Sequence, residues 1–192
     1  MRYAAAAVLS AAVTVLGAGA SAQDAKDGKY VSKDGGFSVT FPKGVELKTK
    51  NMDLPGGMKM TMISADGGAE KKGLMVMHMA FPPNITAAMP AEKLLEMIAK
   101  QSAAKAGGTE VSNKEIAFGK DKYPGREIVL DKDGVTVNLK IVMADPNLYV
   151  LTTAGPKSYL DSDEVKAFQK SFEITAPAKS AKKSPATKKA ID

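Results

Sequence analysis

Alternating hydrophobic and polar positions predict a first strand near the start of the body of the chain. In residues 37–41, aromatic and aliphatic side chains alternate with hydroxyl-bearing ones. A period of two is typical of a strand with one buried face. A Pro-Lys-Gly turn follows, so we expect residues 45–49 to continue as the antiparallel partner of this strand.

Two methionine-rich segments also have the character of strands. In residues 58–63, methionine alternates with other residues between two glycine-rich turns. Residues 74–81 are apolar at nearly every position. Such a segment indicates a strand that is covered on both faces and is therefore central in its sheet.

Four more strands are predicted in close succession, at residues 110–118, 123–130, 135–144 and 147–154. Tight turns connect them, among them the turn Asp131-Lys132-Asp133-Gly134. Connections this short can join only antiparallel neighbours. The four segments therefore predict a meander.

Apolar residues at helical spacing predict two helices, one before and one after this meander. The first begins with Pro90, which suits the first helical position, and ends at Gly107. The second covers residues 161–171, with Asp161 or Ser162 as its cap. The positions expected to face inward are Ala91, Leu94, Leu95, Ile98 and Ser102 in the first helix and Val165, Phe168 and Phe172 in the second.

Together these elements predict the fold class α+β, an antiparallel sheet with helices packed on it. We assign residues 34–175 to the globular domain and expect the polar residues 23–33 to form a flexible segment. Residues 176–192 are rich in Lys, Ala, Ser and Pro. They bury too little apolar surface to offset chain entropy, so we expect a disordered tail.

The first 22 residues have the features of a secretory signal peptide. Arg2 precedes an apolar run, and small residues form a cleavage site just before Gln23. The apolar run is shorter than the ~20 residues that a bilayer-spanning helix needs. We therefore expect a mature chain that begins at Gln23, has no transmembrane segment and is periplasmic or secreted.

Charge and cysteine content exclude several classes of protein. The net charge of +6 includes Arg2 and a net four charges in residues 176–192, which leaves about +1 for residues 23–175. A nearly neutral body does not suit nucleic-acid binding, which needs a basic face. Because the chain has no cysteine, a thiol nucleophile, a thiolate metal site and a redox pair are also excluded.

Four short motifs resemble landmarks of the PsbP-like superfamily. They are Gly36-Phe37-Ser38-Val39-Thr40-Phe41-Pro42, Tyr123-Pro124-Gly125-Arg126-Glu127, Leu148-Tyr149-Val150-Leu151 and Phe168-Gln169-Lys170-Ser171-Phe172. Their order along the chain carries the resemblance. That superfamily includes the extrinsic photosystem II protein and many exported bacterial proteins. The resemblance implies an αβα sandwich around an antiparallel sheet and a non-catalytic binding or accessory module, and it transfers no site residues.

Few residues are candidates for catalysis. His78 is the only histidine, so a Ser-His-Asp triad would have to use it. We expect instead a core histidine with a hydrogen-bond partner, pointing away from the neighbouring methionines of its strand. Glu127, Asp131 and Asp133 could form an acid–base pair, but aspartates in a turn need no catalytic explanation. We therefore expect no catalytic residue, and a hydrolase is the enzymatic alternative.

The methionines supply the one alternative with a named metal. The candidate ligands are Met58, Met60 and Met62 on one strand and Met75, Met77 and Met79 on another. Thioethers favour Cu(I), and several sulfurs would converge if the two strands are neighbours. Methionine also fills irregular space in cores, and spacing alone does not separate the two interpretations.

The sequence as a whole therefore predicts an exported, non-enzymatic binding or accessory domain of the cell envelope without a cofactor. A periplasmic Cu(I)-binding module is the alternative. Outside the cytoplasm, an anionic lipid surface or cell-wall polymer is the expected partner of the basic tail. The lysines of that tail are Lys179, Lys182, Lys183, Lys188 and Lys189.

Overall fold

The computed structural model describes residues 28–66 and 71–175. The signal peptide predicted at residues 1–22 and the basic tail at residues 176–192 lie outside this part, as do residues 23–27. None of the helices in the described residues combines the length and the apolar character needed to cross a membrane.

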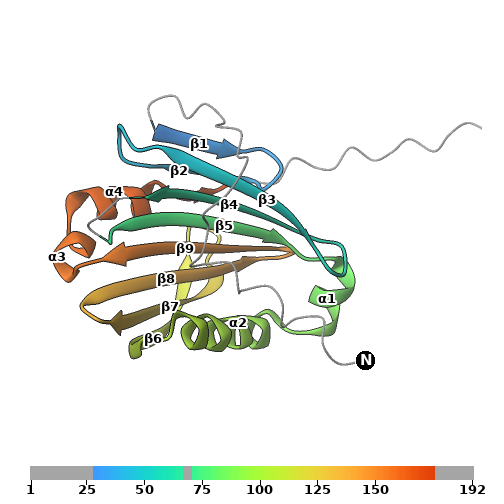
Figure 1. Ribbon diagram of the computed structural model, residues 1–192. Coiled ribbons are helices and arrows are strands. Elements are labelled where there is room, and N and C mark those ends of the chain that lie inside the picture. The colour runs from blue at the N-terminus through green and yellow to red at the C-terminus, as the bar shows by residue number, and fades with distance from the viewer. Residues whose placement is uncertain (1–27, 67–70, 176–192) are drawn as a thin grey trace, which may run out of the picture.

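A seven-stranded antiparallel sheet forms the centre of the fold (Figure 1). Its strand order is β3-β4-β5-β9-β8-β7-β6, so the predicted meander is confirmed as β6 to β9. β5 lies between β4 and β9 and is buried on both faces, as its apolar sequence predicted. The strands are β3 (Leu47–Leu54), β4 (Met58–Asp66), β5 (Gly73–Ala80), β6 (Thr109–Phe118), β7 (Tyr123–Lys132), β8 (Val135–Ala144) and β9 (Asn147–Gly155).

The turn between β7 and β8 shows how local sequence fixes this pairing. Its two central residues, Asp133 and Gly134, have φ values of 53° and 76°. Positive φ at both positions defines a type I′ turn, whose twist matches that of the flanking strands. Asp133 therefore serves the geometry of the turn, whereas Asp131 belongs to β7.

A second, three-stranded sheet joins the two ends of the described chain. It contains β1 (Lys29–Ser32), β2 (Phe37–Thr40) and β10 (Glu173–Ile174) in the order β1-β2-β10. The prediction that residues 45–49 pair with the first strand is wrong. β3 pairs with β4 instead, because β2 takes a partner from each end of the chain. Residues 29–32 form a strand rather than a flexible segment, since Tyr30 is buried against Phe37.

Four helices are present in the described residues: α1 (Pro83–Ala88), α2 (Ala91–Ala106), α3 (Lys157–Leu160) and α4 (Asp163–Ser171). Pro90 precedes α2 rather than occupying its first position, and Gly107 ends the helix with φ of 66°. The second predicted helix, residues 161–171, is confirmed as α4, and the short helix α3, which the sequence analysis did not predict, precedes it. Ser162, one of the two predicted caps, lies between the two helices with an extended backbone. Its Oγ accepts a hydrogen bond of 3.3 Å from the backbone N–H of Val165, which caps α4.

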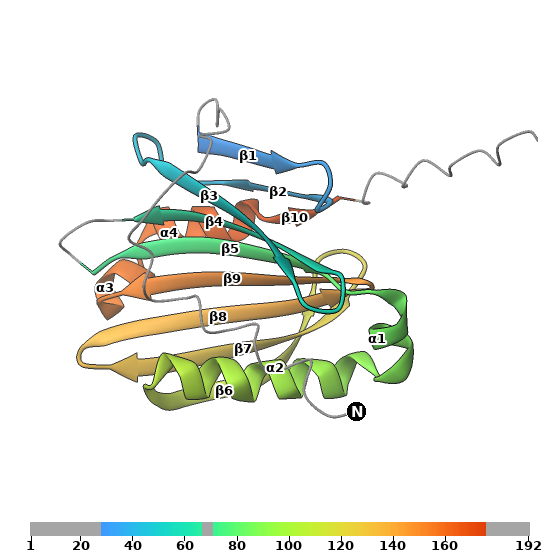
Figure 2. The same ribbon diagram turned by 45° about the vertical axis from the view of Figure 1, so that its right-hand side comes forward.

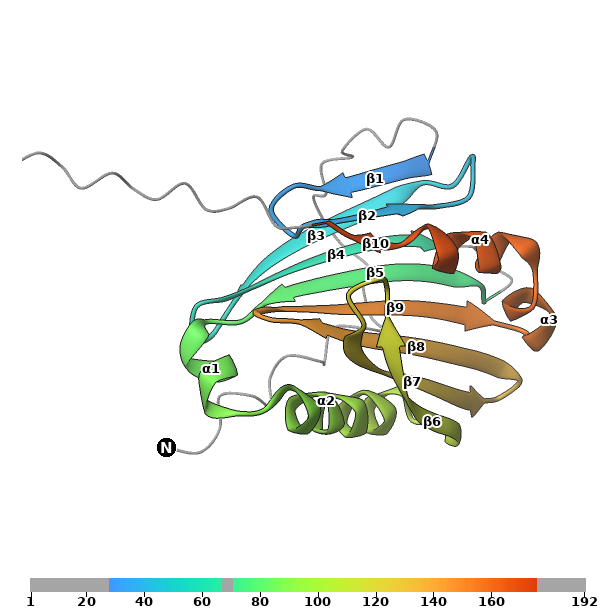
Figure 3. The same ribbon diagram turned by 180° about the vertical axis from the view of Figure 1, so that it is seen from behind.

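Two hydrophobic cores lie on opposite faces of the large sheet. On one face, Leu94, Leu95 and Ile98 of α2 pack over β7 and β8. On the other, Val165 and Phe168 of α4 pack with the small sheet. The helix α2 packs against β7 and β8, and α4 lies beside β2 and β10 (Figures 2 and 3). The predicted class, an antiparallel sheet with helices packed on it, is therefore confirmed, with the small sheet sharing the α4 face.

Candidate functional site

His78 is enclosed in the core beneath the small sheet. It projects from β5 to the α4 face, whereas Met77 belongs to the core on the α2 face, as the alternation of the strand predicted. The centroid of its ring lies 6.0 Å from that of Phe37 and 5.3 Å from that of Tyr149. Its Nε2 atom is 2.8 Å from Oδ1 of Asn147. Because an amide oxygen only accepts, Nε2 carries the proton in this arrangement.

Burial decides the charge of this imidazole. It lowers the pKa of His78, and the hydrogen bond to Asn147 opposes only part of this shift. The ring is therefore neutral at pH 7, and the residue is only 6% exposed. A general base must come within reach of its substrate. A ring packed between two aromatic side chains does not meet that requirement, which removes the support for a hydrolase centred on His78.

Three of the four sequence landmarks meet around this histidine. Phe37, Tyr149 and Phe172 come from three different motifs, and their ring centroids lie 5.7–5.8 Å apart. The hydroxyl of Tyr149 donates a 2.7 Å hydrogen bond to the carbonyl oxygen of Gly35. Burial raises the pKa of Tyr149 to about 12. The landmarks therefore hold the small sheet on the large one.

Glu127 is the most buried of the predicted carboxylates. Its Oε2 is 2.8 Å from Nζ of Lys114, and its Oε1 is 3.5 Å from Nζ of Lys140 and accepts a 3.1 Å bond from Asn138. Burial by itself raises the pKa of the Glu127 carboxyl. The hydrogen bonds from Lys114 and Asn138 and the charges of both lysines outweigh burial and lower this pKa. The group is a carboxylate at neutral pH and stabilises the sheet surface as an ion pair.

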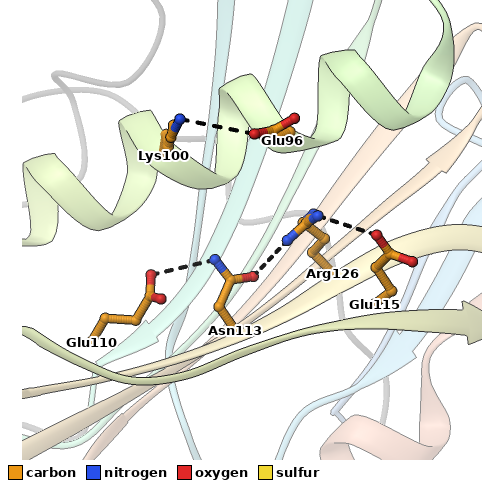
Figure 4. A network of polar contacts seen from close by, with 6 residues as sticks. All are labelled: Glu96, Lys100, Glu110, Asn113, Glu115 and Arg126. Atoms are coloured by element: carbon orange, nitrogen blue, oxygen red, sulfur yellow. Dashed lines mark hydrogen bonds and ion pairs between the residues drawn. The ribbon is translucent and has the colours of Figure 1, made fainter.

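Arg126 precedes Glu127 on β7 and makes a second polar network on the opposite face of that strand (Figure 4). One guanidinium nitrogen donates to Oδ1 of Asn113 at 3.0 Å, and the other lies 3.2 Å from Oε1 of Glu115. The amide of Asn113 in turn donates to Glu110 at 3.3 Å. Adjacent strand residues face opposite sides, so Arg126 and Glu127 belong to separate networks.

The structure does not assemble the three predicted carboxylates into a pair. Asp133 lies in the β7–β8 turn, and Asp131 is exposed opposite Thr136 of β8. Asp131 lies four positions after Glu127 on the same strand, a distance of about 13 Å between backbone positions. The carboxyl groups therefore do not share the close environment that an acid–base pair needs.

The two methionine-rich segments are neighbouring strands. In the register of β4 and β5, Met60 lies opposite Met79, and Met62 lies opposite Met77. Directly opposite residues share a face of the sheet, so all six predicted thioethers point to the α2 face. Met58, Met60, Met62, Met77 and Met79 are buried, and Met75 is half-buried.

Sequence reasoning missed two further methionines on this face. Met52 of the edge strand β3 lies opposite Met60, and Met143 of β8 lies opposite Leu148, the neighbour of Met79 on β9. No local pattern marks either residue as a candidate ligand. Only the strand register shows that they continue the same line of side chains.

A small pocket of about 80 Å³ lies where β4 and β5 approach α3 and α4. Tyr159 and Glu164 line it, and the Tyr159 hydroxyl donates to Oε1 of Glu164 at 3.1 Å. The ammonium of Lys72 lies 5.2 Å from the centroid of the Tyr159 ring. Pockets that enclose a small-molecule ligand usually measure 300–1,000 Å³, so this one is too small to enclose such a ligand.

Comparison with solved structures gives several matching chains. No protein-family model matches the chain, and no curated protein matches its sequence. The structure is similar to the solution structure of cyanobacterial PsbP (CyanoP) from Synechocystis sp. PCC 6803. The two chains are 14% identical, with a TM-score of 0.49, and the similarity covers 76% of this chain and 91% of that one. The similarity concerns the fold alone.

Proposed function

We propose that this chain is an exported, non-enzymatic binding or accessory domain of the cell envelope that acts through its surface. One observation carries the proposal: the residues best suited to catalysis are occupied in packing and ion pairs within the fold. His78 is packed between aromatic rings, and Glu127 is paired with two lysines. Both stabilise the sheet, which leaves recognition to the outer surface and to the basic tail.

The tail supplies the charge for such recognition. Its five lysines and one aspartate give residues 176–192 a net charge of about +4 on a nearly neutral body. Basic segments near an anionic membrane gain about 1 kcal/mol per lysine, and this attraction is screened by salt. The proposed partner is an anionic lipid surface or cell-wall polymer.

Vesicle binding tests this role. The exported protein is mixed with vesicles of phosphatidylcholine alone or with phosphatidylglycerol added, at two salt concentrations. We expect binding to the anionic vesicles only, weaker at high salt. A variant in which all five tail lysines are replaced by glutamine should lose this binding, and a matched variant with five arginines should keep it. Equal binding of the wild type and the glutamine variant would reject the electrostatic role.

Export is tested separately, because a surface role could exist in another compartment. We expect N-terminal sequencing of the protein from the periplasmic or secreted fraction to begin at Gln23. Full-length chain that remains in the cytosolic fraction would contradict the proposal.

A second candidate function is a Cu(I)-binding module. The observation that favours it is the pairing of the two methionine-rich strands, which places Met60 opposite Met79 and Met62 opposite Met77. Competition with a chromogenic Cu(I) chelator under reducing conditions measures uptake. Failure of the wild-type protein to take Cu(I) from the chelator would eliminate this candidate.

A further inference from the structure

Three methionines from three neighbouring strands form one line across the large sheet. Met52 of β3 lies opposite Met60 of β4, and Met60 lies opposite Met79 of β5. We call these three residues the methionine row. Since directly opposite residues share a face, all three side chains project to the α2 face of the sheet.

The geometry of an antiparallel sheet lets these side chains meet. The Cβ atoms of directly opposite residues lie about 4.5–5.5 Å apart, and a methionine side chain has three rotatable bonds. The sulfurs of Met52 and Met79 can therefore both turn toward that of Met60 without a change in the backbone. Leu148 follows Met79 on β9 and ends the row.

The donor set selects the kind of ion. Three thioethers are soft and carry no charge, and soft thioether ligands select Cu(I). A neutral apolar site compensates no ionic charge, so a monovalent ion is less costly to bury there than a divalent one. Hard ions such as Mg²⁺ and Ca²⁺ prefer oxygen ligands, which the methionine row does not offer.

The three members of the methionine row differ in exposure. Met52 lies on the edge strand of the sheet and is half-buried, whereas Met60 is 3% exposed and Met79 is 2% exposed. Met52 therefore offers a first thioether at the rim, and the two others lie in the core.

The adjacent line of side chains on the same face is less suitable for binding Cu(I). Met62 and Met77 also lie opposite each other, but the edge position beside them is Lys50, which is exposed and lies opposite Met62. A lysine ammonium at the rim repels a cation and supplies no lone pair. The methionine row, in contrast, has a thioether at each of its three positions.

From these observations we propose that Met52, Met60 and Met79 form a Cu(I) site with three thioether ligands, loaded from the β3 edge. The site rests on the second candidate function, that the protein binds Cu(I). It adds Met52 as the entry ligand and separates the methionine row from the other methionines of the same face.

The direct test is NMR of the wild-type protein labelled at the methionine ε-methyl groups, titrated with Cu(I) under reducing conditions. We expect the signals of Met52, Met60 and Met79 to shift at one equivalent. Met143 lies on the same face beyond Leu148, so its signal should not move. Shifts confined to Met62 and Met77 would overturn the assignment.

Chelator competition with single variants provides the second measurement. Met52→Leu, Met60→Leu and Met79→Leu should each weaken Cu(I) binding by about tenfold or more. Met143→Leu and Met62→Leu are the matched controls and should bind as the wild type does. Leucine conserves the volume of methionine, so the fold is retained, and Met52→Leu at the half-buried edge perturbs the core least.

Different results would reject the copper function and the three-methionine site. Absence of Cu(I) uptake by the wild type would reject the copper function together with this site. Uptake that is unchanged in the three row variants would overturn the site and leave the copper function standing.

Discussion

The Nε2 atom of His78 lies 2.8 Å from the Oδ1 atom of Asn147, although 69 positions separate the two residues in the chain. The bond joins the neighbouring strands β5 and β9 beneath the small sheet. Each residue is 6% exposed, so each supplies the partner that water cannot supply to the other. The only histidine of the protein is thus part of the packing between the two sheets.

Replacing Asn147 by alanine should show the importance of this bond. The substitution leaves the imidazole N–H of His78 buried and unpaired, and we expect the free energy of unfolding to fall by about 1–3 kcal/mol. Urea denaturation at pH 7 measures it. Asn113→Ala removes an amide from an exposed network and should cost less than about 1 kcal/mol. Equal losses in the two variants would contradict a special role for Asn147.

The stability of the protein should fall in mild acid because of His78. Burial lowers the pKa of this residue in the folded state, whereas the unfolded chain takes up its proton with the ordinary pKa of about 6.5. Between these two values the unfolded state binds more protons, so the free energy of unfolding decreases as the pH falls and levels off below the folded pKa. We expect the loss to begin near pH 6.5 in denaturation series.

The variant His78→Gln tests this origin. Glutamine keeps a donor for Asn147 but has no titratable group, so its stability should change less between pH 7 and pH 5 than that of the wild type. An identical pH dependence in both proteins would show that another group is responsible.

Glu127 should affect stability in a lower pH range. Its pKa is lowered in the folded state, so its contribution is present above the ordinary pKa of about 4.3 and is lost as the pH falls through the folded value. Glu127→Gln should therefore lower stability at pH 7 and flatten the loss below about pH 4.3. Glu115→Gln, at a side chain that is 83% exposed, should leave the profile nearly unchanged. A steep acid loss that persists in Glu127→Gln would refute this assignment.

Gly125 is fixed by close packing between strands. A Cβ atom at this position would lie 2.5 Å from the carbonyl oxygen of Ile141 and 3.1 Å from Cγ1 of Ile116. Backbone cannot move aside cheaply, so we expect Gly125→Ala to destabilise the protein by about 1–3 kcal/mol or more. Gly73→Ala is the matched control, because a Cβ there meets no atom within 4 Å. Thermal unfolding compares the two variants, and similar midpoints would disprove the steric explanation.

Much of the fold could be predicted from the sequence, because the hydrophobic pattern of a segment reports the secondary structure of that segment alone. The meander from β6 to β9, the burial of β5 on both faces and the inward positions of α2 each follow from periodicity within one segment. The predictions that were wrong concern which strands pair with each other. The alternation of residues 37–41 indicates a strand but does not name its neighbours, and β2 pairs with β1 and β10 instead of with residues 45–49.

The candidate site was less predictable for the same reason. The sequence pointed to Met58, Met60, Met62, Met75, Met77 and Met79, but it could not show which of them lie side by side. Met52 and Met60 are connected only through the register of β3 and β4. A shift of one residue in that register would place Met52 opposite a different side chain and on the other face.

The sequence by itself determined which segments are strands and helices and which face of each is apolar, since a periodic pattern reports the burial of a single element. Tertiary structure decided which elements meet. It enclosed His78 among Phe37, Tyr149 and Asn147, held Glu127 between Lys114 and Lys140, and aligned Met52, Met60 and Met79. Those contacts depend on pairing between distant segments, and the packing energy of the whole chain selects that pairing.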